Sequence, residues 1–235
     1  NFPCYVAVFD DKNIQTPEDL AYAKAAAKKL NLNLKIIKLN LAEIQTQLKT
    51  IVPLIEDSNV VKVGVALTFF KAAQQARKDG CKVLFSGLGA EELFAGYQRH
   101  KSALNINKEC ASGLLKMYER DLYRDDVISM YNSVELRLPF LDKDLADYSL
   151  KIPPKYKIKN EEEKIILREI ASDLNLQKEF SQRKKKAAQY GSRLHKALQK
   201  LTKLNNHEKI SSYLDTFAPH TNPPLGALLS TGKDS

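Results

Sequence analysis

The chain has 235 residues, of which 43% are hydrophobic and 28% are charged, and its formal net charge is +9 at pH 7. This composition is typical of a folded globular protein and excludes an intrinsically disordered one. No apolar run approaches the roughly 20 residues that cross a bilayer, so we expect no membrane-spanning segment.

Strands and helices are predicted to alternate in the first part of the chain. Short apolar runs indicate strands, and apolar residues at helical spacing indicate helices. In chain order we expect a strand at residues 4–9, a helix from 17, a strand at 34–39, a helix from 41, a helix at 60–76 and a strand at 82–85. This alternation is typical of βαβ units and predicts an α/β fold with a parallel sheet.

The remaining chain is predicted to be helical until its last residues. After Tyr97 the strand pattern stops, and residues 103–204 indicate successive helices interrupted at prolines. We divide the chain into an α/β core with a helical second half (1–204), a helix with a proline-rich linker (205–222), and a final strand with its loop (223–235). We assign this last segment to the core.

The last six residues form a candidate phosphate-binding loop, because they follow the apolar run at 225–229. Small residues bring backbone N–H groups close to a ligand, hydroxyls donate hydrogen bonds, and a lysine adds positive charge. The spacing is not that of a Walker loop. It resembles the S-G-G-x-D-S loop of the PP-loop ATP pyrophosphatases, and its residues are Ser230, Thr231, Gly232, Lys233, Asp234 and Ser235.

A second motif, S-G-L-G-A-E-E-L-F-A-G-Y at residues 86–97, resembles the signature of the asparagine synthetases. Further segments match this family in order, at residues 135–142, 164–169 and 183–192. The last of them is most similar to asparagine synthetase domain-containing proteins and their archaeal relatives. The resemblance implies a parallel sheet of the adenine nucleotide alpha-hydrolase (HUP, PP-loop) type with a helical C-terminal part.

The same resemblance implies an ATP-dependent, AMP-forming amide ligase. Such an enzyme adenylates a carboxylate, here expected to be aspartate, and ammonia then displaces AMP. The cofactors implied are ATP and Mg²⁺. The motifs align Lys164 with the catalytic lysine, and Asp234 and Glu91 with the metal ligands. The implied nucleotide-binding residues are those of the loop 230–235 together with Val8, Phe9, Ser86, Gly87 and Gly89.

Two positions depart from the family pattern. Leu88 stands where the asparagine synthetases usually carry a glutamate that assists the reaction of the intermediate, and leucine can neither accept a proton nor orient an amine. Glu91 replaces an aspartate and is one methylene longer, although it still offers oxygen ligands. Either ammonia transfer is assisted differently, or the substrate is not aspartate.

Two alternative functions come from other features. The basic run at 183–186 favours a PP-loop enzyme that adenylates a tRNA base, although the family motifs argue against nucleic acid as a partner. Leu88 and Glu91 favour a non-catalytic ATP-binding subunit. An oligomer is compatible with the sequence but is not indicated by it.

The positions of the cysteines bear on the source of the amide nitrogen and on the cellular location of the protein. A glutaminase domain of this family starts with a catalytic cysteine, whereas this chain starts with Asn1, so we expect free ammonia or a separate glutaminase partner. The three cysteines, Cys4, Cys81 and Cys110, form no C-x-x-C pair, which favours free thiols in the cytoplasm.

The order of the segments differs from that of the family, where the phosphate loop comes first and its helix next. Here the loop comes last. Either the segments are out of their natural order and a helix is missing between Ser235 and Asn1, or the chain is a circular permutant. The first interpretation is favoured, because a loop at a chain end would fray.

Overall fold

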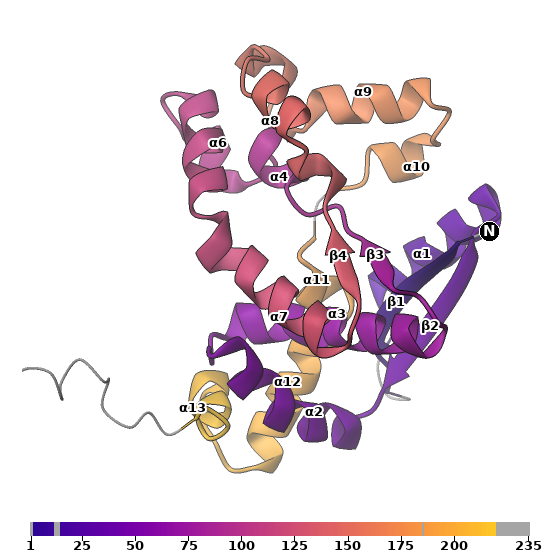
Figure 1. Ribbon diagram of the computed structural model, residues 1–235, viewed down its shortest axis with the longest axis vertical. Coiled ribbons are helices and arrows are strands. Elements are labelled where there is room, and N and C mark those ends of the chain that lie inside the picture. Colours follow the sequence, from indigo (N-terminus) through magenta and orange to yellow (C-terminus); the bar gives the residue numbers. More distant parts are fainter. Residues whose placement is uncertain (1, 12–14, 185, 220–235) are drawn as a thin grey trace, which may run out of the picture.

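The computed structural model of the chain describes residues 2–11, 15–184 and 186–219. It is an α/β structure with far more helix than strand (Figure 1). Its first sheet pairs β1 (Pro3–Phe9) with β2 (Asn33–Leu39) in parallel, so that Pro3 lies opposite Asn33 and Phe9 opposite Leu39. A second sheet pairs β3 (Val83–Phe85) in parallel with β4 (Glu135–Arg137).

The helices of the first half lie where the sequence predicts them. They are α1 (Glu18–Leu30), α2 (Leu41–Ile55) and α3 (Val60–Lys78). The side chain of Asn40 accepts a hydrogen bond from the Glu43 backbone at 2.9 Å while the Glu43 carboxylate accepts one from the Asn40 backbone, which fixes the start of α2. Asn59 caps α3 in a similar way.

The second half is built from short helices. After Tyr97, the largest are α6 (Ile106–Leu115), α7 (Tyr123–Tyr131), α9 (Ile165–Asp173) and α12 (Leu194–Leu204). A π-helical turn at Tyr118–Leu122 precedes α7. The smaller elements are α4 (Ala90–Leu93), α5 (Gln98–Lys101), α8 (Lys143–Ser149), β5 (Ile158–Lys159), β6 (Glu162–Glu163), α10 (Lys178–Ser181), α11 (Ala188–Gly191) and α13 (Ile210–Asp215).

The prediction that residues 103–204 contain helices only was wrong. Glu135–Arg137 forms β4, and a small antiparallel hairpin joins β5 to β6. These strands have only two or three residues, too few for an alternating pattern to be recognised. In the same segment, Arg137 Nε donates to the Glu135 carboxylate at 2.8 Å, and the Asp142 carboxylate caps α8.

A single parallel sheet is not present in the described part of the chain. β1 and β3 do not pair with each other, so the four parallel strands form two separate two-stranded sheets. The predicted strand at 225–229 and its loop lie outside the described residues.

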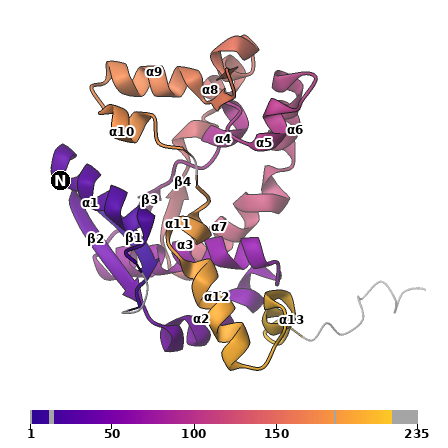
Figure 2. The ribbon, with the colours of Figure 1, turned by 180° about the vertical axis from the view of Figure 1, so that it is seen from behind.

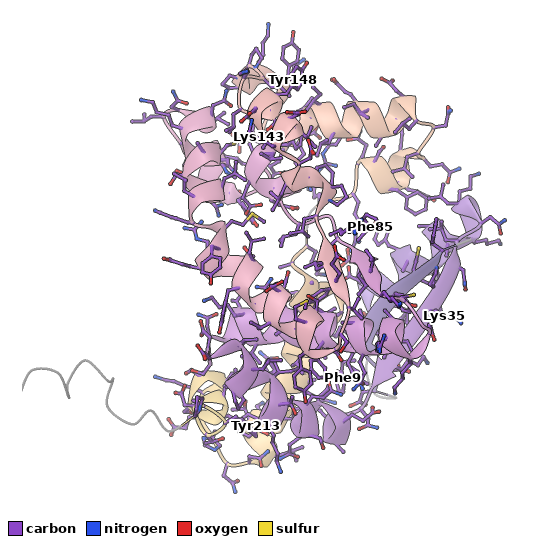
Figure 3. The ribbon with its side chains drawn as sticks, viewed as in Figure 1. Phe9, Lys35, Phe85, Lys143, Tyr148 and Tyr213 are labelled. Atoms are coloured by element: carbon purple, nitrogen blue, oxygen red, sulfur yellow. The ribbon has the colours of Figure 1, made fainter. Side chains whose placement is uncertain are left out.

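The main core lies below the strands in Figure 1. We use this name for the apolar cluster formed by α2, α3, α7, α12 and α13 with the ends of β1 and β2, whose largest members include Phe9, Leu39, Leu48, Leu67, Leu198 and Tyr213. Phe9 and Tyr213 mark it in Figure 3. Because Tyr213 and Leu214 are buried here, α13 packs against the same core as β1.

A second, smaller cluster lies in the helical lobe, by which we mean α4, α5, α6 and α8–α10. Figures 1 and 2 show this lobe at the opposite end of the molecule from α2, α12 and α13. Leu93, Phe94 and Ile152 form the centre of the cluster, and α8 and α9 contribute partly buried side chains. Within the described residues, no helix is long and apolar enough to cross a membrane.

Candidate functional site

A cavity of about 1340 Å³ lies between the two parallel sheets and extends to the helical lobe. One wall is mainly apolar and comes from β1, β3 and the face of α3 that includes Val61, Val65 and Phe69. The opposite end is charged. Its side chains come from α4, α5, the π-helical turn and the start of α7, and they are Glu91, Glu92, Arg99, Arg120, Asp121, Arg124 and Asp125.

Glu91, at this charged end, forms an ion pair with Lys164, which is 73 residues away in sequence and does not itself belong to the lining. Lys164 Nζ lies 3.1 Å from Glu91 Oε1, and both side chains are about one-fifth exposed, at 22% and 20%. Lys164 caps α9 with a positive φ of 57°, a conformation that is uncommon for a residue with a side chain. The fold thus brings together the predicted catalytic lysine and one predicted metal ligand.

Gly96 makes room for this pair and was not singled out by the sequence. A Cβ atom at Gly96 would lie 2.9 Å from Glu91 Cγ and 3.1 Å from Lys164 Cδ, closer than packed carbon atoms normally approach. The glycine in the F-A-G-Y part of the motif was the available signal. A side chain here would displace Glu91, Lys164 or both.

The structure brings only some of the other candidate residues to the cavity. Ser86 and Gly87 line it, and the Leu88 backbone N–H donates to Ser86 Oγ at 3.3 Å, which shapes the turn. Val8 and Phe9 are buried and do not belong to the lining. Gly89 has a φ of +99°, and a Cβ there would lie 2.5 Å from Leu141 Cδ2, so this glycine is needed for packing.

The remaining candidates, Ser230, Thr231, Gly232, Lys233, Asp234 and Ser235, lie outside the described residues. Their roles, like those of Val8, Phe9 and Gly89 in nucleotide binding, stay predictions. Leu88 does line the cavity, so the position that carries a glutamate in the asparagine synthetases faces the candidate site here as an apolar side chain.

Sequence reasoning missed a buried charged cluster beside the Glu91–Lys164 pair. Arg124 is 5% exposed and bonds Asp125 at 2.7 Å and Asp121 at 3.0 Å. Glu92 is 2% exposed, and burial raises its pKa while Tyr97 opposes that shift. Asp121 and Arg124 are three residues apart, a helical spacing that usually indicates an exposed ion pair, so the pattern alone does not indicate burial.

Mg²⁺ prefers oxygen ligands, and the Glu91 carboxylate lines the cavity. Among the described residues, no three His, Cys, Asp or Glu side chains converge to hold a metal ion. Mg²⁺ commonly takes one or two carboxylates together with substrate phosphates, so the Glu91 carboxylate suits it as a single protein ligand. Asp234, the other predicted ligand, lies outside the described residues.

Two residues of the basic run, Arg183 and Lys186, pack against the start of α1. Arg183 bonds Asp19 at 2.6 Å and lies over the Tyr22 ring, and Lys186 pairs with Glu18. Lys186 also lines the cavity, whereas Lys184 is exposed. Arg183 and Lys186 therefore have acidic partners within the chain, which leaves less positive charge for nucleic acid than the sequence indicates.

Comparisons with known proteins identify the family of the chain. The model of the family described as asparagine synthase matches residues 1–112 and 102–217, and the match ends before the loop at 230–235. The chain is 33% identical to a putative glutamine-hydrolysing asparagine synthetase of Methanocaldococcus jannaschii, over 86% of this chain and 44% of that protein.

Other relatives match over shorter stretches. The mouse asparagine synthetase domain-containing protein 1 is 32% identical over 57% of this chain and 23% of that protein. The human glutamine-hydrolysing asparagine synthetase is 33% identical over 52% of this chain and 23% of that protein. The chain thus spans less than half the length of these relatives. Because the family match extends over both sheets, the cavity and the helical lobe, the chain belongs to the asparagine synthase family.

Proposed function

We propose that this protein is an ATP-dependent, AMP-forming amide ligase that adenylates a carboxylate, with aspartate as the expected substrate, for attack by ammonia. A carboxylate oxygen attacks the α-phosphorus of ATP and pyrophosphate leaves. Ammonia then attacks the carbonyl carbon, AMP leaves and a proton is released. Both steps develop negative charge on phosphate oxygens, so the protein has to stabilise that charge.

The observation that carries the proposal is the ion pair between Lys164 and Glu91, of which Glu91 lines the cavity. Lys164 supplies a positive charge that can move from the Glu91 carboxylate to a phosphate oxygen as charge develops there. Glu91 holds the amine in place before the substrates bind and offers an oxygen to Mg²⁺, which when bound neutralises phosphate charge. The left-handed backbone of Lys164 and the absence of a side chain at Gly96 let the Lys164 and Glu91 side chains lie in contact.

The proposal also includes the loop at 230–235 as the phosphate cradle. β1 and β3 each have one unpaired edge within the described residues, and both line the apolar wall of the cavity. A strand at 225–229 placed between them would pair with both and bury its apolar side chains. Its loop would then lie at the same end of the sheet as Ser86 and Gly87.

Pyrophosphate release from ATP tests the function. We expect release that requires Mg²⁺ and aspartate, and asparagine formation when ammonia is added. Asp234→Ala should abolish the Mg²⁺-dependent release. ATP binding without pyrophosphate release, for every carboxylate tried, would instead identify a non-catalytic nucleotide-binding protein.

A shortened chain tests the placement of the loop separately. A chain that ends at residue 219 keeps every described residue, including α13. It should lose pyrophosphate release and still unfold cooperatively, but at a lower temperature than the full chain, because the strand proposed between β1 and β3 is missing. Full activity of the shortened chain would show that the phosphates are held by another segment. That result would leave the amide-ligase assignment intact and remove only the loop from it.

A further inference from the structure

Two ion pairs join the segment that contains α4 and α5 to the β5–β6 hairpin and the residue after it. Glu91 of α4 pairs with Lys164, which directly follows the hairpin, at 3.1 Å. Lys101, the last residue of α5, pairs with Glu163 of β6 at 2.9 Å. The neighbouring residues 163 and 164 thus carry opposite charges, and each has a partner of the other sign on the same α4–α5 segment.

The Lys101–Glu163 pair is largely shielded from water. The two side chains are 15% and 22% exposed. Burial alone would raise the pKa of Glu163, but the hydrogen bond from Lys101 helps to lower it below the ordinary 4.5. Salt screens a shielded pair less than an exposed one, and shielding also limits the freedom of the two side chains. This pair is therefore suited to hold two segments at a constant distance.

Hydrogen bonds of the hairpin and of α9 hold the backbone around Lys164. β6 pairs with β5, and the Ile165 N–H donates to the Lys157 carbonyl at 3.1 Å. Arg168 Nε also donates to the Glu163 carbonyl at 2.8 Å. These bonds maintain the positive φ of Lys164, which would otherwise be costly, but none of them reaches α4 or α5. Side chains that cross between the two segments have to set the place of the Lys164 amine relative to α4.

The second ion pair matters when the charge of Lys164 is used. In the proposed reaction the Lys164 amine moves from Glu91 to a phosphate oxygen, so the pair between Lys164 and Glu91 opens. The Lys101–Glu163 pair takes no part in this exchange and stays closed. It holds the hairpin against the α4–α5 segment when the other pair no longer does. This is important because a displacement of about 1 Å in a reacting group can lower a rate by about 100-fold.

We propose that Lys101 and Glu163 are positioning residues for Lys164. Their ion pair keeps the hairpin against the α4–α5 segment while Lys164 stabilises the developing phosphate charge. Both residues act through the place of the Lys164 amine and not by contact with the substrates. This role rests on the proposed function and on the part of Lys164 in it.

Pyrophosphate release by variants of the full chain tests this role. Lys101→Met and Glu163→Gln should each lower kcat by about 10- to 100-fold and leave the KM for ATP unchanged, because only the transition state uses the moved amine. In a protein that already carries Lys164→Ala, Lys101→Met should lower the residual rate no further, since the amine that it positions is absent. Lys101→Arg keeps a charged donor to Glu163 and should keep kcat within about twofold of the wild type.

Acetylation of lysine amines gives a second measurement, which needs no enzymatic activity. The full chain is treated briefly with acetic anhydride, and its peptides are quantified by mass spectrometry. In Lys101→Met, Lys164 should react about threefold faster or more than in the wild type, because its pair with Glu91 opens more often. Lys28, an exposed lysine on α1, should react equally in both proteins. Lys143→Met removes an exposed ion pair of α8 and is the control variant that should change neither measurement.

The outcomes separate the positioning role from the proposed function. If the wild-type protein releases no pyrophosphate with any carboxylate, the proposed function fails, and unchanged acetylation of Lys164 in Lys101→Met would then overturn the positioning as well. If release occurs but Lys101→Met lowers it by the same factor with and without Lys164, the function stands and the positioning role is overturned. If Lys101→Met does not fold, Glu163→Gln decides, because an unchanged kcat in that variant would also overturn the role.

Discussion

The two ends of the molecule bury different kinds of side chain. The main core is apolar, and its buried members come from β1, β2, α2, α3, α7, α12 and α13. Among the described residues, the buried acidic and basic side chains instead come from 92–157, in the helical lobe and at the start of α7, and they are Glu92, His100, Arg124, Asp125 and Lys157. The helical lobe has only a small apolar cluster to offset them.

This difference indicates that the main core mainly stabilises the fold, whereas the charged end of the cavity mainly serves function. An apolar core stabilises a fold by removing hydrocarbon from water, whereas buried charges cost free energy unless each is fully paired. Costly buried charges beside a cavity are typical of functional sites. We therefore expect changes in the main core to affect folding, and changes at the charged end to affect chemistry.

The largest effect is expected for Lys164→Ala. Loss of a positive charge that stabilises the transition state should lower pyrophosphate release by about 10³-fold, with little change in the unfolding midpoint because Lys164 is partly exposed. Lys159→Ala, an exposed lysine on β5, is the matched control and should keep full activity. A Lys164→Ala protein with normal activity would remove this residue from the mechanism.

Leu48→Ala should have the largest effect on stability. Leu48 is fully buried in the main core, and its truncation leaves a cavity that should lower the free energy of unfolding by about 3 kcal/mol. Urea denaturation measures this value. Leu145→Ala, at a partly buried position packed against the small cluster of the helical lobe, should cost about 1 kcal/mol. Equal costs at both positions would contradict the contrast between the two ends.

Lys157→Met should stabilise the protein by about 1 kcal/mol at pH 7. Lys157 is fully buried, its Nζ has no hydrogen-bond partner among the described residues, and burial lowers its pKa while Cys110 opposes the shift. A lowered pKa in the folded state favours the neutral amine, so the wild-type protein loses stability as the pH falls through that value. The gain from Lys157→Met should therefore shrink toward pH 10.5, the ordinary pKa of a lysine.

The expected pH dependence of the Lys157→Met effect can be measured directly. Urea denaturation of both proteins at pH 7 and pH 10.5 gives the two differences in the free energy of unfolding. A destabilised Lys157→Met protein at pH 7 would mean that the buried amine is favourably bound.

Asp57→Asn should have the smallest effect, a loss of about 0.5 kcal/mol at pH 7. Burial alone would raise the pKa of Asp57, but hydrogen bonds from Lys62 Nζ at 2.6 Å and the Asn59 backbone at 2.7 Å lower it below the ordinary 3.8. Because the pKa of Asp57 is lower in the folded state, the ionised carboxylate stabilises that state at pH values above the ordinary pKa. This stabilisation is lost as the pH falls through the folded-state pKa. The difference between the two proteins in thermal unfolding should thus disappear in strong acid.

The sequence predicted the first half of the fold well because its elements are long and carry their own start and stop signals. β1, β2 and α3 begin and end within about two residues of the expected positions, and α1 and α2 begin within about one residue of theirs. β4 was missed because its three residues are defined by pairing with β3, a contact between distant parts of the chain. Local patterns hold no information on such a pairing.

The sequence also predicted part of the candidate site, namely the residues that lie in local motifs. Lys164, Glu91, Ser86 and Gly87 lie in motifs of fixed spacing, and the structure brings Lys164 to Glu91. The Arg124 cluster was missed, because a run of charged residues at helical spacing has the same pattern whether it faces solvent or a cavity. Only the tertiary structure, which places Arg124 in the lining of the cavity, decides between these two surroundings.

The central claim, adenylation of a carboxylate, is tested most directly with aspartate labelled with ¹⁸O in its side-chain carboxylate. The full chain is incubated with the labelled aspartate, ATP, Mg²⁺ and ammonia, and the AMP and the amide are analysed by mass spectrometry. An acyl-adenylate route transfers one labelled oxygen to each AMP that forms together with asparagine. Amide formation with unlabelled AMP, or with ADP and labelled phosphate, would contradict the account.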